Sequence, residues 1–313
     1  MRTATDAPGG LVGRVPALGI GLEYQEALRP FIESEVDAFD FLEVIPDLLW
    51  LDRGPEVAPR YVDNEAQTAF IERVAGRRPI LCHSIGLSIG SAERFDTDHV
   101  ERIAAWWRRF DFSWHSDHLA YQRVELDGSD VNVGLTLPLA LDRETLDLLV
   151  PRIRQIRETI PIPFLLENNV YFYELPENEI DEPAFLNELC ERSGCGLLLD
   201  LHNLHVNSRN HGIDPHRWLE RLDLANVVEI HLAGGMELEG FYLDAHSGAV
   251  PEPVWELVDA VLPGLPNLGA MVFEMVGSWY DEIGPTGLRS ELERMRAAWQ
   301  RHGLRTPAGV APR

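Results

Sequence analysis

Eight short, almost uninterrupted apolar runs recur along the 313-residue chain and restrict its fold more than any other feature. Nearly continuous hydrophobic runs of this length are typical of parallel strands that helices cover on both faces. Amphipathic segments separate the runs, so the pattern predicts eight strand–helix units. The runs span residues 17–22, 39–45, 79–85, 112–117, 162–168, 196–201, 227–233 and 269–275.

The segments between the runs have helical periodicity and recognisable ends. Asp96 or Thr97 is a candidate cap for one helix, Asp214 and Pro215 open another, and Gly194 is expected just past the end of a third. Eight such units predict an α/β fold, a (β/α)8 TIM barrel with its active site at the C-terminal strand ends. We expect a single barrel domain over residues 15–303, with disordered tails at 1–14 and 304–313. The helices are expected over residues 23–35, 64–76, 96–110, 142–160, 181–194, 214–224, 250–262 and 285–303.

Composition narrows the class of protein. The net charge of −24 repels phosphate backbones, which argues against nucleic-acid binding and weakly favours a cationic partner or peptide. No apolar stretch is long enough to span a membrane, and the N-terminus lacks a secretory pattern. The three cysteines have no CxxC spacing, which favours a reducing cytoplasm and buried thiols.

Acidic and histidine side chains stand where the predicted strands end. If the strands close into a barrel, these ends meet at one face, and residues far apart in the chain become neighbours. Asp244 and His246 lie in the loop after the seventh strand with their side chains on one side, and Asn203 follows Asp200 closely enough to share a site with it. The strand-end residues are Glu43, His83, Asp117, His118, Glu167, Asp200, His231 and Glu274.

Imidazole and carboxylate ligands together suit iron, manganese or zinc. Eight or nine ligands exceed what one ion uses, so the set predicts at least two ions bridged by carboxylates. Taken singly, each histidine is more often a packed, hydrogen-bonded residue, so the hypothesis rests on convergence. Three further histidines, His202, His205 and His211, follow the sixth strand in a predicted loop. They could be metal ligands, hydrogen-bond donors that support the ligands, or substrate contacts. His99, His216 and His302 fall in predicted helices and are expected at the surface, and the direction of His115 stays open.

Several stretches resemble the multinuclear non-haem iron-dependent oxidases, a family that includes the iron-containing enzyme of methanobactin biosynthesis. The resemblance runs from about residue 17 to 280, and its most specific parts are HSIGLSIGS, SDHL and DAHSGAVPEPVW. It implies a barrel that holds two or three irons and uses O2 to modify a ribosomally synthesised precursor peptide, often at cysteine, with a partner protein presenting the peptide. The other matching stretches are GIGLEY, FLEVIPDLLW, SWHSDHLAY, LLENN, LLLDLHNLHVNS and EIHLAGG.

The resemblance also assigns roles to residues. Asp200, His246 and Glu274 would act in catalysis as well as in metal binding. Residues that would support the ligands or contact substrate are Glu43, Asp117, His202, His205, Trp50 and Tyr171, and Tyr121 and Trp279 are further candidates for the pocket wall. The implied metal set is His83, His118, Glu167, Asp200, Asn203, His231, Asp244, His246 and Glu274.

The chain departs from the family pattern beside its ligands. His202-Asn203 stands where members usually have Asn-Asn, the fifth-strand motif continues as Asn169-Val170-Tyr171, and Glu274 leads into Met-Val-Gly-Ser-Trp-Tyr. Two alternatives therefore stay open. One is a zinc or manganese hydrolase or isomerase on a barrel like that of xylose isomerase or endonuclease IV, and the other is a non-catalytic metal-binding scaffold that docks a peptide.

Overall fold

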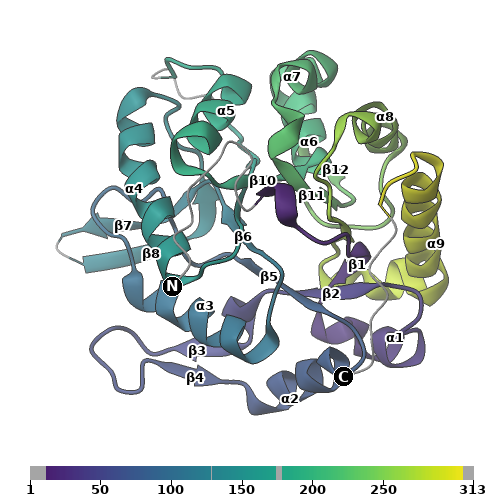
Figure 1. Cartoon of the computed structure of the whole chain (residues 1–313), viewed down its shortest axis with the longest axis horizontal. Coiled ribbons are helices and arrows are strands. Elements are labelled where there is room, and N and C mark those ends of the chain that lie inside the picture. Colours follow the sequence, from purple (N-terminus) through teal and green to yellow (C-terminus); the bar gives the residue numbers. More distant parts are fainter. Residues whose placement is uncertain (1–11, 128, 174–177, 306–313) are drawn as a thin grey trace.

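The eight predicted strands form a closed, all-parallel barrel in which each strand pairs with the next in chain order (Figure 1). The computed structural model describes residues 12–127, 129–173 and 178–305. The prediction of a TIM barrel is confirmed. The barrel strands are β1 (Gly19–Glu23), β2 (Phe41–Val44), β5 (Ile80–Ser84), β6 (His115–His118), β9 (Phe164–Glu167), β10 (Gly196–Asp200), β11 (Val227–Leu232) and β14 (Ala270–Phe273).

Helices surround the barrel, and several begin and end where the sequence indicates. Asp96 caps α3 by accepting a hydrogen bond from the His99 amide, Asp214 caps α7, and Gly194 ends α5 in the left-handed conformation with φ 73°. The helices are α1 (Arg29–Ser34), α2 (Glu65–Ala75), α3 (Thr97–Phe110), α4 (Arg143–Thr159), α5 (Glu182–Ser193), α6 (Leu201–His211), α7 (Pro215–Arg221), α8 (Glu252–Val261) and α9 (Tyr280–Arg301).

Two helical expectations are wrong. The loop expected after the sixth strand is helix α6, which Asp200 caps and Gly212 ends with φ 70°. The buried face of this helix carries many polar residues, so the sequence lacks the apolar periodicity that predicts a helix. The helix expected over 23–35 is shorter, because a 3-10 turn over Glu26–Leu28 precedes α1.

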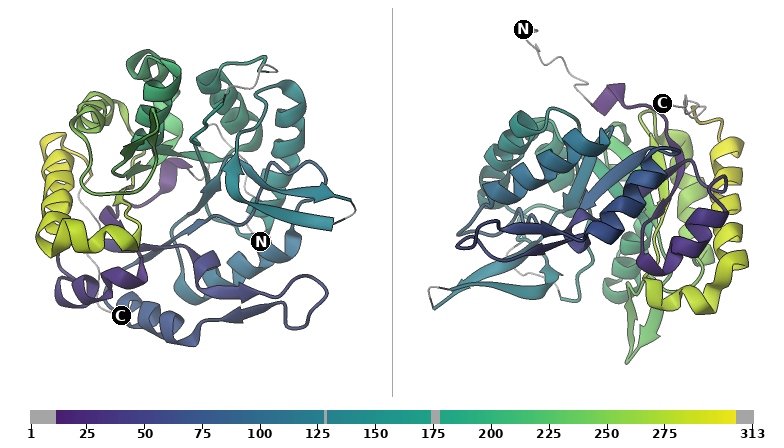
Figure 2. Two further views of the ribbon diagram at one scale, coloured as in Figure 1. Left: turned by 180° about the vertical axis from the view of Figure 1, so that it is seen from behind. Right: turned by 90° about the horizontal axis from the view of Figure 1, so that it is seen from below.

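Three antiparallel hairpins extend the loops on the C-terminal side of the barrel, and the sequence did not indicate them (Figure 2). They follow β2, β6 and β11, so they all border the face at which the strand-end residues meet. Their side chains are largely half-buried or exposed, and the strands lack the continuous apolar runs of the barrel. The hairpins are β3 (Trp50–Asp52) with β4 (Tyr61–Asp63), β7 (Tyr121–Leu126) with β8 (Ser129–Leu137), and β12 (Met236–Leu238) with β13 (Phe241–Leu243).

One cluster of buried apolar side chains extends from Val12 to Trp299 and joins the strands to the helices. The expected tails, 1–14 and 304–313, lie mostly outside the described residues. Where they are described, Val12–Arg14 form a 3-10 turn with Val12 in the core, and the Arg305 guanidinium donates to the Val15 carbonyl at 2.8 Å. Across the part of the chain that the structure describes, no helix combines the length and apolar character needed to cross a membrane.

Candidate metal centre

The C-terminal strand ends carry a dense group of buried acidic and imidazole side chains. Strand alternation decides which residues join it, since neighbouring residues point to opposite faces. On β6, Ser116 and His118 face the interior while His115 and Asp117 face the surrounding helices. His83 on β5 likewise faces inward, where its Nδ1 lies 2.9 Å from the Ser116 Oγ.

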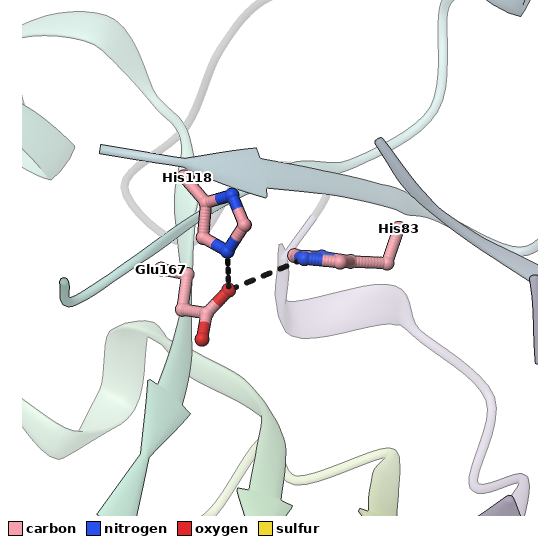
Figure 3. Close-up of side chains that lie close together, drawn as sticks. All are labelled: His83, His118 and Glu167. Atoms are coloured by element: carbon pink, nitrogen blue, oxygen red, sulfur yellow. Dashed lines mark ion pairs between the residues drawn. The ribbon is translucent and has the colours of Figure 1, made fainter. Parts of the chain in front are cut away.

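Two imidazoles converge on one carboxylate oxygen (Figure 3). His83 Nε2 and His118 Nε2 each lie 3.3 Å from Glu167 Oε2. Burial lowers the pKa of His83 well below its usual value, and burial lowers that of His118 to about 4. Both rings are therefore neutral, which is the form that binds a metal. The Ser116 hydroxyl fixes the orientation of the His83 ring.

Helix α6 places the next two candidates. Asp200 Oδ1 accepts from the Asn203 amide at 2.8 Å as the helix cap, which leaves Oδ2 buried without a hydrogen-bond partner. The Asn203 side chain donates to Glu167 Oε1 at 3.1 Å. Asn168 makes two hydrogen bonds to the Asp200 backbone, at 2.8 and 2.9 Å, and so ties the end of β9 to the end of β10.

His231 stands between two acids. Its Nε2 lies 3.0 Å from Glu43 Oε1 and its Nδ1 lies 2.9 Å from Glu274 Oε1. Burial alone would lower the pKa of His231, but Glu274 and Glu43 outweigh it and raise the pKa well above its usual value. Glu43 is in turn next to Glu229, which accepts from the Trp114 indole at 2.8 Å.

Asp244 joins two further histidines at the barrel mouth. Its Oδ1 lies 2.9 Å from His202 Nδ1, and its Oδ2 lies 3.1 Å from His246 Nε2. His246 Nε2 is also 3.6 Å from Glu274 Oε2. His202 is fully buried on α6, whereas the His246 side chain is 25% exposed and faces the opening. Asp244 thus connects the helix to the loop after β11.

The donor set fits a centre with more than one metal ion. Ligand atoms of His83, His118 and Glu167 lie within 4.8 Å of one another, and so do those of Glu167, Asp200 and His231. Glu167 belongs to both groups, as a bridging carboxylate would. Buried polar atoms without a partner are rare in native structures, and such atoms in this group fit a metal ligand set. They include Asp200 Oδ2 and Asn203 Oδ1.

Comparison with known proteins identifies the family. The family model described as RiPP precursor modification enzyme MbnB/TglH/ChrH matches residues 17–297. The chain belongs to this family. A relative named UPF0276 protein, from Caulobacter vibrioides, is 32% identical over 90% of this chain and 93% of its own length.

Similar solved structures support the fold of the chain and nothing beyond the fold. An L-ribulose 3-epimerase aligns with a TM-score of 0.53 at 15% identity, over 92% of this chain and 99% of its own. A xylose isomerase-like TIM barrel protein from Mycobacterium smegmatis aligns with a TM-score of 0.52 at 15% identity, over 92% and 98%. The family match, rather than these structures, confirms the resemblance that the sequence motifs indicate.

Some predicted residues lie apart from the centre. Asp117 faces outward, where Oδ2 accepts from the Leu87 amide at 3.3 Å and so holds the HSIGLSIGS loop. His115 also faces outward, against Phe164. His99 was expected at the surface but is buried, with Nε2 3.1 Å from Ser84 Oγ, because α3 turns it toward the barrel.

Several of the residues proposed to line the pocket or support the ligands also lie away from the centre. Trp50 packs against Tyr61 and Trp106 between the first hairpin and α3, away from the ligands. Tyr171 stacks on His211 at the end of α6, and His205 packs against Tyr242. Tyr121 begins β7 beside the mouth, and Trp279 packs partly buried against the core.

Sequence reasoning missed three buried residues of the centre, Glu23, Glu229 and Asn168. Glu23 directly follows the first apolar run and obeys the same strand-end rule as the other candidates. Glu229 precedes His231 by two residues, so alternation puts it on the same inward face. Asn168 lies within the LLENN motif, but no spacing rule indicates its hydrogen bonds to the Asp200 backbone.

Proposed function

We propose that the protein is a multinuclear iron-dependent oxidase that uses O2 to modify a residue of a ribosomally synthesised precursor peptide. The observation that carries the proposal is the approach of His83 and His118 to one oxygen of Glu167. Glu167 also belongs to the group with Asp200 and His231. A bridging carboxylate between nitrogen-rich and oxygen-rich positions suits first-row metals such as iron.

The proposed ligands are the nine residues that the motifs indicate. Iron, when bound, supplies one-electron chemistry and a place for dioxygen to react. The chain's own residues orient and enclose the site. Ser116 and Asn203 hold His83 and Glu167 in place, and His202 holds Asp244. The set is His83, His118, Glu167, Asp200, Asn203, His231, Asp244, His246 and Glu274.

Asp200, His246 and Glu274 are the proposed catalytic residues. The partly exposed His246 side chain faces the mouth, where a substrate side chain would enter, and the buried Glu274 carboxylate lies 3.6 Å from it. Burial raises the pKa of Asp200 to about 6, with Glu274 and Asp244 adding to the shift. Its Oδ2 has no hydrogen-bond partner and is the atom that would bind a metal.

A peptide substrate agrees with the family and with the mouth of the barrel. Phe172 is 43% exposed and Phe241, on the third hairpin, is 46% exposed. Their rings lie 6.4 Å apart and offer an apolar surface beside the entrance. We propose that an extended precursor peptide, with cysteine as one candidate target, enters here and that a partner protein presents it.

The test combines metal content with product analysis. Protein purified without oxygen should contain two or more irons, consume O2 with a candidate precursor peptide from a neighbouring open reading frame, and change the mass of that peptide. His118→Ala should lose iron and activity, whereas His216→Ala, on the exposed face of α7, should retain both.

Two results would contradict the proposal. Turnover of a small substrate with manganese or zinc in the absence of O2 would favour a hydrolase or isomerase. Tight binding of iron and peptide with no O2 consumption would favour a non-catalytic scaffold.

A further inference from the structure

The first barrel strand brings an additional carboxylate into the centre. Glu23 is the last residue of β1 and is 2% exposed. Parallel pairing aligns Leu22 with Phe273 and Glu23 with Glu43. Glu23 therefore lies beside Glu274, the residue after β14.

Glu23 is close enough to share an ion with two of the proposed ligands. One ligand atom each from Glu23, His246 and Glu274 lies within 4.8 Å of the others. The Gln25 side chain donates a hydrogen bond to Glu23 Oε1 and fixes the orientation of the carboxylate. Two carboxylates buried side by side repel each other unless a proton or a cation lies between them.

The surroundings favour a cation at this position. His246 supplies a nitrogen ligand, so the group is more than a cluster of acids. None of its members belongs to the groups around Glu167, which places any ion here apart from that carboxylate. The 25% exposure of the His246 side chain leaves this end open to the mouth.

We propose that Glu23 is a metal ligand, and that with it the first strand completes a metal position at His246 and Glu274. Gln25 is then a positioning residue that holds Glu23 toward the ion. This proposal rests on the metal centre proposed above and adds Glu23 to the nine ligands proposed there.

The experiment measures ion binding rather than turnover. Metal-free protein is titrated without oxygen with Fe²⁺ and, separately, with Mn²⁺, and bound metal is counted after gel filtration. Glu23→Gln should bind one ion fewer than the wild type, or hold one ion at least about tenfold more weakly, since it replaces a charged ligand with a neutral one. The matched control is Glu26→Gln, because Glu26 is a nearby acid whose side chain is 65% exposed. This control should bind metal as the wild type does.

Further variants keep the test decisive. Glu23→Asp retains the charge and should recover part of the lost binding. If circular dichroism shows that Glu23→Gln does not fold, Glu23→Asp and Gln25→Ala are compared with the wild type. Both variants should bind one of the ions more weakly. Wild-type stoichiometry and affinity in the folded Glu23 and Gln25 variants would overturn the assignment.

The two proposals fail in different ways. If His118→Ala loses ions but Glu23→Gln does not, the Glu23 assignment is wrong and the centre at Glu167 stands. If Glu23→Gln loses an ion but the loaded wild type never consumes O2 with peptide, the oxidase proposal is wrong and the Glu23 ligand stands.

Discussion

Two buried serines on neighbouring strands offer a test of the proposed centre. Each contacts a histidine, but only Ser116 faces the interior of the barrel. Ser116 Oγ lies 2.9 Å from Nδ1 of His83, a proposed ligand. Ser84 Oγ lies 3.1 Å from Nε2 of His99, outside the barrel. We predict that Ser116→Ala weakens metal binding and that Ser84→Ala does not.

The magnitude follows from what each hydroxyl holds. Residues that orient a metal-bound histidine typically contribute about 10–100-fold in metal affinity, or about 1.4–2.7 kcal/mol. Leaving a buried imidazole nitrogen without its partner also destabilises the fold, by about 1–3 kcal/mol. Ser116→Ala should show both losses. Ser84→Ala should show only the loss of stability.

Two measurements separate these effects. Urea unfolding of the metal-free variants gives the free energy of unfolding, and an anaerobic Mn²⁺ titration gives the metal affinity. Equal metal affinity in Ser116→Ala and the wild type would refute the argument that the serine orients a ligand. Equal weakening by both variants would show that general loosening of the strands, rather than ring orientation, sets the affinity.

Three further predictions concern stability, each measured by urea unfolding. Asp96→Ala should lower the free energy of unfolding by about 2–4 kcal/mol, because Asp96 caps α3 and accepts two hydrogen bonds from Arg60 at 2.7 and 2.9 Å. A loss no larger than that of a helix cap alone would show that the ion pair with Arg60 adds no stability. Burial lowers the pKa of His115 from 6.5 to about 3, so the unfolded chain binds the extra proton and stability should fall as pH drops below about 6.5. His115→Leu should remove up to about 1.4 kcal/mol per pH unit from that slope, and an unchanged slope would contradict the assignment. Gly86→Ala should lower the free energy of unfolding by about 1–3 kcal/mol, because the Cβ of the alanine would lie 2.4 Å from Asp47 Oδ1. A variant as stable as the wild type would show that the loop shifts to accommodate the methyl group.

The barrel could be predicted from the sequence because its signal is local. Each strand is a continuous apolar run, and each run is followed by a polar residue that a closed barrel brings to one face. The hairpins could not be predicted in this way, since their strands are partly exposed and interrupt their apolar residues with charged and polar ones. Helix α6 was missed because its buried face carries polar residues such as His202 and Asn203, which are typical of loops.

Membership of the centre was harder to predict than its existence. Asp117 and His118 are adjacent, and only the register of β6 decides that the histidine faces the interior. Glu23 directly follows the first apolar run, as His118 follows the fourth, so the strand-end rule that selected His118 applies to Glu23 as well. Glu23 was overlooked because the rule was not applied to the first strand.

The same alternation explains why stability and metal binding can be changed separately. On β5, His83 faces the ligands while Ser84 faces Asp47 and His99 at 3.1 Å from each. The β5 backbone is held by pairing with β2 and β6 on either side, so loss of an outward side chain leaves His83 in place. Outward contacts therefore stabilise the strand, and inward contacts set the geometry of the ligands. A variant that weakens metal binding by disturbing ligand geometry must therefore act on the inward face, which is where Glu23 and Ser116 lie.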